Sequence, residues 1–265
     1  MNAEDPIGIF DSGIGGLTVA HAINKILPYE KIVYFGDTQH LPYGNKSINK
    51  ITQYSIKIVD FLLKQKCKAI IIACNSASAV AYQEIVKNKV PIFDVIKPVI
   101  HYISSQKHIQ HIGVIGTNAT ISSGVYKDYI HAVRKDVKVS SLATPLLASL
   151  IEEDDRKLYQ KGIIEAYLEN NKLKNIDSLI LGCTHYPLIE TQINEFYNKK
   201  VEIISAIKYI GHSVKKVLEK NNLLNQKNSK HKHHFYVSDY TTNFQKKTKL
   251  FFPKSIILEQ ENIFS

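Results

Sequence analysis

Short apolar runs alternate along the chain with longer segments in which apolar residues recur every three or four positions. Segments 6–10, 31–35 and 69–73 are mainly apolar and have the length of a buried strand. Segments 17–27 and 48–66 have the spacing of an amphipathic helix instead. Alternation of this kind is typical of parallel sheets flanked by helices, so the pattern predicts an α/β fold.

The same alternation continues along the chain. Further strands are expected at 91–95, 111–115, 137–142, 178–182 and 201–204, and further helices at 77–86, from about 99, and at 122–133, 145–170, 188–197 and 209–224. The helical stretch 145–170 is expected to break near the acidic cluster 152–155. Ligands of such sheets bind beyond the carboxyl ends of the strands, so the residues that follow each strand are the candidates for chemistry.

An internal repeat divides the chain. Segment 7–12 resembles segment 112–117, and segment 70–76 resembles segment 178–184, in the same order and at nearly the same offset. The repeat predicts two similar domains, each a mostly parallel sheet flanked by helices, related by a pseudo-two-fold axis with the active site in the cleft between them. The first domain is expected to comprise residues 1–97 plus 208–265, because the tail returns to the first sheet. The second is expected to comprise residues 98–207.

Composition indicates a folded, cytoplasmic protein. The chain has 265 residues, of which 44% are hydrophobic and 22% charged, which excludes a disordered chain. No apolar stretch is long enough to span a bilayer, so no membrane association is expected. Residues 1–5 contain two acids and no basic side chain, unlike a secretory signal. With no export signal, the three cysteines are expected to be reduced in the cytoplasm.

Positive charge is concentrated near the C-terminus. The formal net charge is +10, and residues 199–265 hold 13 Lys against 5 acidic residues. A basic surface can bind nucleic acid or another acidic partner. The basic residues of this segment are all Lys, however, whereas surfaces that recognise phosphates usually prefer the donor fork of Arg. We therefore interpret it as a solvated face and expect no nucleic-acid partner.

Two cysteines occupy the same position in the repeat. Cys74 and Cys183 each directly follow an apolar strand and precede small hydroxyl or amide residues that can cap a helix. A thiol at a helix N-terminus lies at the positive end of the dipole, so we expect a lowered pKa for both. Cys67 lies at a helix–strand junction with no capping neighbour, and we interpret it as structural.

Two similar domains that face each other would place these two thiols on opposite sides of one cleft. Stereochemical inversion at a carbon needs such opposed and equivalent acid–base groups. One thiolate removes a proton from one face, and the other thiol delivers a proton to the opposite face. The backbone N–H groups at the two helix N-termini would bind a carboxylate.

Neither a cofactor nor a metal ion is expected. The glycine-rich segment 11–16 lacks the third Gly of a dinucleotide-binding fingerprint, because that position is Thr18. The cysteines show no Cys-x-x-Cys spacing of a zinc site. Asp11 could anchor an ammonium group, orient a thiol, or cap a helix. His185, two residues after Cys183, could orient or protonate a neighbour, or donate to the backbone at a helix start.

Four blocks of the sequence resemble the motifs of bacterial glutamate racemases, of the aspartate/glutamate racemase family. They are segment 10–19 (Phe-Asp-Ser-Gly-Ile-Gly-Gly-Leu-Thr-Val), segment 34–44 with Gly-Asp-Thr and Pro-Tyr-Gly, segment 73–79 (Ala-Cys-Asn-Ser-Ala-Ser-Ala) and segment 181–188 (Leu-Gly-Cys-Thr-His-Tyr-Pro-Leu). Segments 116–120 and 150–152 are similar to weaker family segments. The blocks occur in the family's order, and Ser76 stands where the family commonly has Thr.

The resemblance implies cofactor-independent interconversion of L- and D-glutamate, which supplies D-glutamate for peptidoglycan. It implies a two-base mechanism with Cys74 and Cys183 as the acid–base pair, and with Asp11 and His185 as further catalytic groups. The substrate contacts that it implies are Asp11, Ser12, Tyr43, Gly44, Asn75, Ser76, Thr184, His185 and Glu152. The expected partner is thus a small-molecule substrate, and a homodimer is left open.

Three alternatives remain. A related racemase could act on aspartate or another acidic amino acid, which a direct substrate screen would distinguish. A cysteine hydrolase using Cys183 and His185 would form an acyl-enzyme and would not need Cys74. A non-catalytic protein that binds an acidic ligand would bind without turnover.

Overall fold

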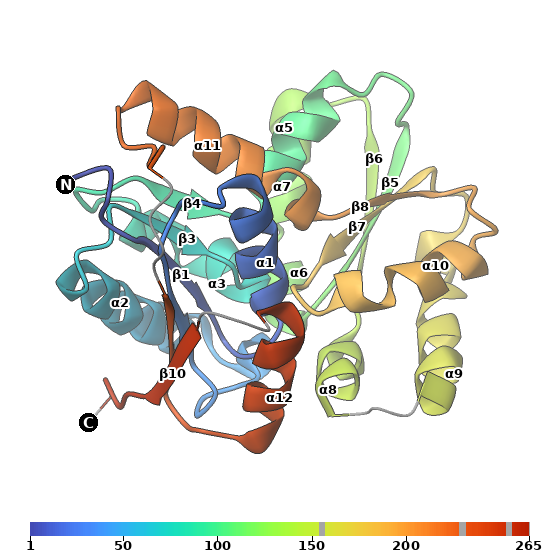
Figure 1. The fold of residues 1–265 in the computed structure, drawn as a ribbon. Helices are drawn as coiled ribbons and strands as arrows, with labels where there is room; N and C mark the ends of the chain where they lie inside the picture. The colour runs from blue at the N-terminus through green and yellow to red at the C-terminus, as the bar shows by residue number, and fades with distance from the viewer. Residues whose placement is uncertain (154–156, 228–231, 253–255, 265) are drawn as a thin grey trace.

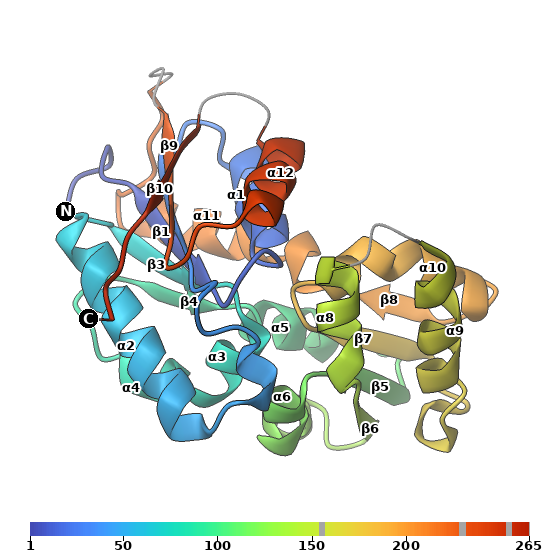
Figure 2. The same cartoon turned by 90° about the horizontal axis from the view of Figure 1, so that it is seen from below.

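Two separate sheets of parallel strands form the framework of the protein. The structure, a computed structural model, describes residues 1–153, 157–227, 232–252 and 256–264. Each sheet is flanked by helices, and the two sheets with their helices lie side by side (Figure 1). Figure 2 shows the same arrangement from below. This architecture confirms the α/β class with two sheets that the alternation of apolar runs predicts.

The larger sheet has six strands in the order β10-β9-β2-β1-β3-β4, and each pair of neighbours is parallel. Its strands are β1 (Ile7–Asp11), β2 (Ile32–Gly36), β3 (Ala69–Ile72), β4 (Ile92–Asp94), β9 (His233–Val237) and β10 (Ile256–Gln260). Strands β1, β2 and β3 are buried along their whole length, as their nearly continuous apolar sequences predict.

The smaller sheet repeats the arrangement of the first four strands. Its order is β6-β5-β7-β8, again all parallel. Its strands are β5 (His111–Gly116), β6 (Lys138–Ala143), β7 (Ser178–Gly182) and β8 (Glu202–Ile204). Strands β1 and β5 hold equivalent central positions, and β3 and β7 hold equivalent positions beside them. The segments that resemble each other in sequence therefore form equivalent parts of the two sheets.

The helices lie in three layers. Those of the described residues are α1 (Leu17–Ile26), α2 (Ile48–Lys64), α3 (Asn75–Val80), α4 (Tyr82–Ile85), α5 (Lys97–Ser105), α6 (Asn118–Ser122), α7 (Val125–Val133), α8 (Pro145–Glu153), α9 (Lys157–Leu168), α10 (Glu190–Phe196), α11 (Ile210–Lys220) and α12 (Thr242–Phe251), with short 3-10 turns η1 (Tyr43–Asn45), η2 (Asn171–Leu173), η3 (Tyr186–Ile189) and η4 (Ala206–Lys208). Helices α2 to α4 share a buried cluster with one face of the larger sheet, and α8 to α10 share one with the smaller sheet. A middle cluster joins α1, α5, α7, α11 and α12 to both sheets.

Side chains along β1 point alternately to the two faces of the larger sheet, so one strand contributes to two buried clusters. Ile7 and Ile9 belong to the middle cluster, whereas Phe10 belongs to the cluster under α2. All three side chains are fully buried. Each such side chain stabilises the fold by roughly 1.5–3 kcal/mol through burial. The layers in turn fix the positions of the loops that follow the strands.

Some elements differ from the sequence-based expectations. The helix expected at 77–86 is two short helices, α3 and α4, and the one expected at 122–133 is divided into α6 and α7 at Gly124, whose φ is +70°. Helix α8 ends at Glu153 and α9 begins at Lys157, and residues 154 and 155 of the acidic cluster, where a break is expected, lie outside the described residues.

The C-terminal tail returns to the larger sheet as expected. Strand β9 pairs with β2, and β10 pairs with β9, with α12 as the crossover between them. All strands of the larger sheet thus come from the two ends of the chain. The division into residues 1–97 plus 208–265 and residues 98–207 remains a prediction.

Candidate active site

One small cavity between the two sheets brings both repeated cysteines together. It lies where the loops after β1, β2 and β3 meet the loops after β5 and β7. Its lining consists of Ser12, Leu41, Pro42, Tyr43, Gly44, Cys74, Asn75, Ser76, Thr117, Ala148, Ser149, Glu152, Cys183, Thr184 and His185. Every site residue expected from the sequence except Asp11 lines it. Its volume of about 30 Å³ has space for only one or two water molecules, so the cleft must open to admit a larger ligand.

Cys74 directly precedes α3, as the repeat predicts, but its thiol does not titrate as expected. Its pKa is raised to about 12, because burial and then the nearby Asp11 disfavour the thiolate. Hydrogen bonding from the Ala77 backbone N–H and to Ser12 works in the opposite direction, with Sγ 3.8 Å from Ser12 Oγ. The expectation of a lowered pKa for Cys74 is therefore wrong: desolvation outweighs a short helix N-terminus.

Cys183 lies at the end of β7 beside an ion pair. Its Sγ is 3.6 Å from Nδ1 of His185, and Nε2 of the same ring is 3.2 Å from Oε2 of Glu152. Burial lowers the pKa of His185, but the hydrogen bonds to Cys183 and Glu152 outweigh burial and hold that pKa well above its usual value. The raised pKa favours the imidazolium form, whose Nδ1 faces Cys183 and whose Nε2 faces Glu152.

Asp11 lies behind the cavity and organises the glycine-rich loop. Its Oδ2 accepts hydrogen bonds from the backbone N–H groups of Gly13 and Gly16, each at 3.0 Å. Its Oδ1 accepts one from Thr184 Oγ1 at 3.4 Å, from the opposite sheet. Burial raises its pKa, which the charge of His185 and these backbone donors oppose. The N-cap of α1 is Gly16, so the alternative that Asp11 caps a helix is wrong, and its carboxylate holds the loop instead.

The glycine-rich loop presses directly against the second cysteine motif. A Cβ on Gly15 would lie 2.4 Å from Thr184 Oγ1 and 2.7 Å from His185 Nδ1, closer than real Cβ contacts. Only Gly allows this approach. Tyr34 on β2 stabilises the loop, because its hydroxyl donates to the carbonyl of Gly13 at 2.7 Å. The loop after β1 of the larger sheet therefore contacts the segment after β7 of the smaller sheet, next to Cys183.

The Pro-Tyr-Gly loop and the first cysteine motif form the other wall. The hydroxyl of Tyr43 donates to Asp37 Oδ2 at 2.6 Å, so the phenol is turned toward its own loop. Ser76 Oγ is 2.8 Å from Thr117 Oγ1, a contact between the two sheets. Asn75 Oδ1 accepts from Tyr126 OH at 2.7 Å. Two of these three bonds therefore join this wall to residues that follow β5.

Some lining residues were not expected from the sequence. They are Leu41, Pro42, Thr117, Ala148 and Ser149. Thr117 occupies the position after β5 that Ser12 occupies after β1, so the repeat could have identified it. Ala148 and Ser149 on α8 could not be identified in this way, because α8 follows β6 in the sequence and its contact with the segment after β7 is a tertiary contact. Cys67 lies away from the cavity, packed beside Gly8, and burial raises its pKa to about 12.

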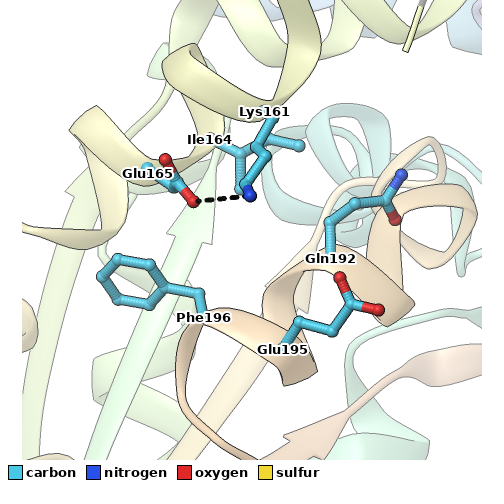
Figure 3. A pocket seen from close by; sticks show the side chains of 6 residues that line it. All are labelled: Lys161, Ile164, Glu165, Gln192, Glu195 and Phe196. Atoms are coloured by element: carbon cyan, nitrogen blue, oxygen red, sulfur yellow. Dashed lines mark ion pairs between the residues drawn. The ribbon is translucent and has the colours of Figure 1, made fainter. Parts of the chain in front are cut away.

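A second groove lies far from the thiols, between α9 and α10 (Figure 3). Lys161, Ile164, Glu165, Gln192, Glu195 and Phe196 line it, and Lys161 pairs with Glu165 at 3.8 Å. Its charged side chains are partly or fully exposed, and its lining contains no Cys, Ser, Thr or His. In the described part of the chain, no helix has the length and apolar character needed to cross a membrane. The same residues contain no cluster of three or more His, Cys, Asp or Glu side chains arranged to hold a metal ion.

Comparison with known proteins decides the family. The family described as Asp/Glu/Hydantoin racemase matches residues 14–210, which include all four motif blocks from Ile14 onward and both cysteines. The chain belongs to this family. Among curated relatives, a glutamate racemase of Syntrophus aciditrophicus is 36% identical over 254 residues, covering 95% of this chain and 94% of the relative. One of Neisseria meningitidis is 39% identical over 249 residues, covering 92% of each.

Solved structures of this racemase family have the same fold. A glutamate racemase isoform of Bacillus anthracis superposes with a TM-score of 0.93 at 32% identity, covering 98% of both chains. One of Francisella tularensis, solved in complex with D-glutamate, gives 0.88 at 35% identity and 97% coverage of both. An aspartate racemase of Picrophilus torridus gives 0.59 at 19% identity, so it shares the fold alone.

Proposed function

We propose that the protein is a glutamate racemase that interconverts L- and D-glutamate without a cofactor, using Cys74 and Cys183 as its two acid–base groups. The main support is that two thiols at equivalent positions of two repeated sheets line one cavity. Relatives named glutamate racemase, at 36% and 39% identity over nearly the whole chain, support glutamate as the substrate.

The chemistry consists of two proton transfers on opposite faces of the α-carbon. With L-glutamate, the Cys183 thiolate takes the α-proton, so that the C–H bond breaks and an S–H bond forms. The electron pair stays on the α-carbon and spreads into the carboxylate. Cys74 then gives its thiol proton to the opposite face, and its S–H electron pair stays on sulfur. D-glutamate leaves an enzyme in which the two protonation states are exchanged, ready for the reverse reaction.

The electrostatics of the cavity suit the L-glutamate direction. Burial and Asp11 raise the pKa of Cys74 to about 12, so Cys74 is a thiol at neutral pH and can act as the acid. Next to Cys183, the His185 cation places an N–H 3.6 Å from the sulfur that must act as the base. The surroundings of the two cysteines thus differ, with an imidazole ring beside Cys183 and a carboxyl group near Cys74.

Substrate binding requires the two sheets to separate and close again. The present cavity is too small for an amino acid, and the contact of Gly15 with Thr184 leaves no room at the loop. Closure over the substrate would exclude water from the carbanion-like transition state. The backbone N–H groups near Ser12, Asn75 and Thr184 would bind the carboxylates. We place the enzyme in the cytoplasm, where its D-glutamate would feed peptidoglycan synthesis.

The test is incubation of dialysed, chelator-treated protein with L-glutamate, followed by chiral chromatography. We expect D-glutamate to accumulate until both enantiomers are equal, with much slower turnover of aspartate. Equal or faster turnover of aspartate would reassign the substrate. No racemisation of either amino acid would refute the proposal.

A cysteine hydrolase is the second candidate, because the Cys183–His185 pair at 3.6 Å is also the arrangement of a nucleophile and its base. It predicts a covalent acyl-enzyme on Cys183 and full activity of Cys74→Ala. The racemase predicts no acyl-enzyme and loss of turnover in that variant. Mass spectrometry of the protein during turnover distinguishes the two.

A further inference from the structure

The C-terminal helix α12 is firmly attached to the larger sheet. Thr241 caps its first turn by accepting a hydrogen bond from the Phe244 N–H at 3.1 Å. Phe244 is fully buried, its ring centroid is 6.3 Å from that of Tyr34, and a Cβ on Gly36 would lie 3.0 Å from its ring. The helix start therefore has a fixed position relative to the strand that carries Tyr34.

One side chain of this helix reaches across to α8 on the other sheet. Asn243 Nδ2 donates to the backbone carbonyl of Glu152 at 3.0 Å. Glu152 lies in the last turn of α8, where carbonyl groups have no partner within the helix. Figures 1 and 2 both show α12 beside α8. The bond thus gives the carbonyl of Glu152, in a helix of the smaller sheet, a donor from a helix of the larger sheet.

The anchored residue is the one whose side chain pairs with His185. Glu152 Oε2 is 3.2 Å from His185 Nε2, and a Cβ on Gly13 would lie 3.3 Å from Oε1, so the carboxylate has little free space. A small shift of the end of α8 would change the distance in this pair. Within the proposed racemase function, we propose that Asn243 is a positioning residue that holds the end of α8 so that Glu152 stays against His185.

This role gives the basic C-terminal segment a function in the reaction that requires none of its lysines. It also predicts a particular pH effect. The charged or titratable groups that act on His185 are Cys183, Glu152 and Asp11, from β7, α8 and β1. When Glu152 is held less closely, the cation loses part of its stabilisation, so the pKa of His185 falls.

The experiment compares Asn243→Ala with Thr242→Ala in the full-length protein. Thr242 is the exposed neighbour in the first turn of α12, and its truncation leaves the bond to Glu152 intact. We expect Asn243→Ala to lower kcat by about threefold to tenfold, the range of one lost hydrogen bond. We also expect the alkaline limb of its pH profile to move to lower pH, and Thr242→Ala to match the wild type in both.

Hydrogen exchange without substrate tests the contact separately from catalysis. Amides in the last turn of α8 should exchange faster in Asn243→Ala than in the wild type or Thr242→Ala. Unchanged exchange there, an unshifted pH profile, or the same changes in Thr242→Ala would overturn the positioning role. Failure of the wild type to racemise glutamate would instead refute the proposed function, and the exchange comparison would still decide whether Asn243 holds α8.

Discussion

Nε2 of His185 lies 3.2 Å from Oε2 of Glu152, and the two side chains are only 6% and 12% exposed. Burial by itself would keep the imidazole neutral. The pKa of His185 is nevertheless well above its usual value, because its bonds to Cys183 and Glu152 outweigh the loss of water. The pair is therefore an electrostatic element of the site, in addition to joining α8 to the segment after β7.

The first prediction is that Glu152→Gln lowers the pKa of His185. The amide keeps the size of the side chain but removes the charge that favours the imidazolium. Because the folded pKa is raised above the unfolded value of about 6.5, protonated His185 stabilises the fold fully below that pH, and this stability is lost as pH rises through the folded pKa. The alkaline limb of kcat should accordingly move to lower pH in the variant.

Titration of the His185 ring by NMR in wild type and variant measures the shift directly. Glu165→Gln is the matched control, because Glu165 is a surface carboxylate on α9 that pairs only with Lys161 among the described contacts. An unchanged His185 titration in Glu152→Gln would mean that the ion pair does not set the charge of the ring.

The second prediction concerns the close approach of the two sheets. In Gly15→Ala, the new methyl group would meet Thr184 Oγ1 at 2.4 Å and His185 Nδ1 at 2.7 Å, so the loop and the cysteine motif must move apart. We expect kcat/KM to fall by about tenfold or more, since displacement of about 1 Å at a reacting group can cost about a hundredfold.

The matched control for that change is Gly162→Ala. Gly162 lies within α9, and a Cβ there would meet nothing within 4 Å. Replacement of a helical Gly by Ala should leave turnover unchanged and stabilise the fold by about 0.5–1 kcal/mol. Wild-type kcat/KM in Gly15→Ala would show that the closed contact is not part of the working enzyme.

The third prediction concerns the hydrogen bond between Tyr34 and the glycine-rich loop. Tyr34→Phe removes the hydroxyl that donates to the Gly13 carbonyl at 2.7 Å and leaves that buried acceptor without this donor. We expect the free energy of unfolding to fall by about 1–3 kcal/mol. Denaturant unfolding measures it. Tyr29→Phe, on a side chain that is 41% exposed, should change it by less than about 0.5 kcal/mol.

The sequence contains enough information for the two sheets and for most of the cavity lining. Strand alternation is a pattern of residues close together in the chain, and the repeat around Cys74 and Cys183 corresponds to the equivalent orders β2-β1-β3-β4 and β6-β5-β7-β8. The lining residues expected from a motif directly follow a strand or lie within four residues of its end, apart from Tyr43 and Gly44 in η1 and Glu152 on α8.

Properties that depend on tertiary packing could not be predicted in this way. The helix-dipole argument for Cys74 gave the wrong direction of pKa shift, because it left out the complete burial of the thiol beside Asp11. The contact of Asn243 with Glu152 joins residues 91 positions apart and has no sequence signature. The role of Asp11 at the substrate stays a prediction, because the bonds that its carboxylate makes here are to Gly13, Gly16 and Thr184.

The fourth prediction is that each thiol serves one enantiomer. By resemblance to the family, Cys183 takes the α-proton of L-glutamate and Cys74 takes that of D-glutamate. A Cys→Ser change leaves a hydroxyl, which ionises far less readily than a thiol, so either variant should lose net racemisation by about a hundredfold or more in both directions. Cys67→Ser is the control: that thiol lies outside the cavity, so the variant should keep its turnover.

The remaining thiol can still remove a proton from its own face of the substrate. In deuterated water, Cys74→Ser should therefore exchange the α-proton of L-glutamate in preference to that of D-glutamate, and Cys183→Ser should show the reverse preference. If both cysteines only packed the core, the two variants would lose activity through destabilisation and show no preference between enantiomers. NMR of the α-proton, measured for each variant with each enantiomer, separates these cases. Equal exchange of both enantiomers by either variant would contradict the two-base assignment, because a single remaining base reaches only one face of the α-carbon.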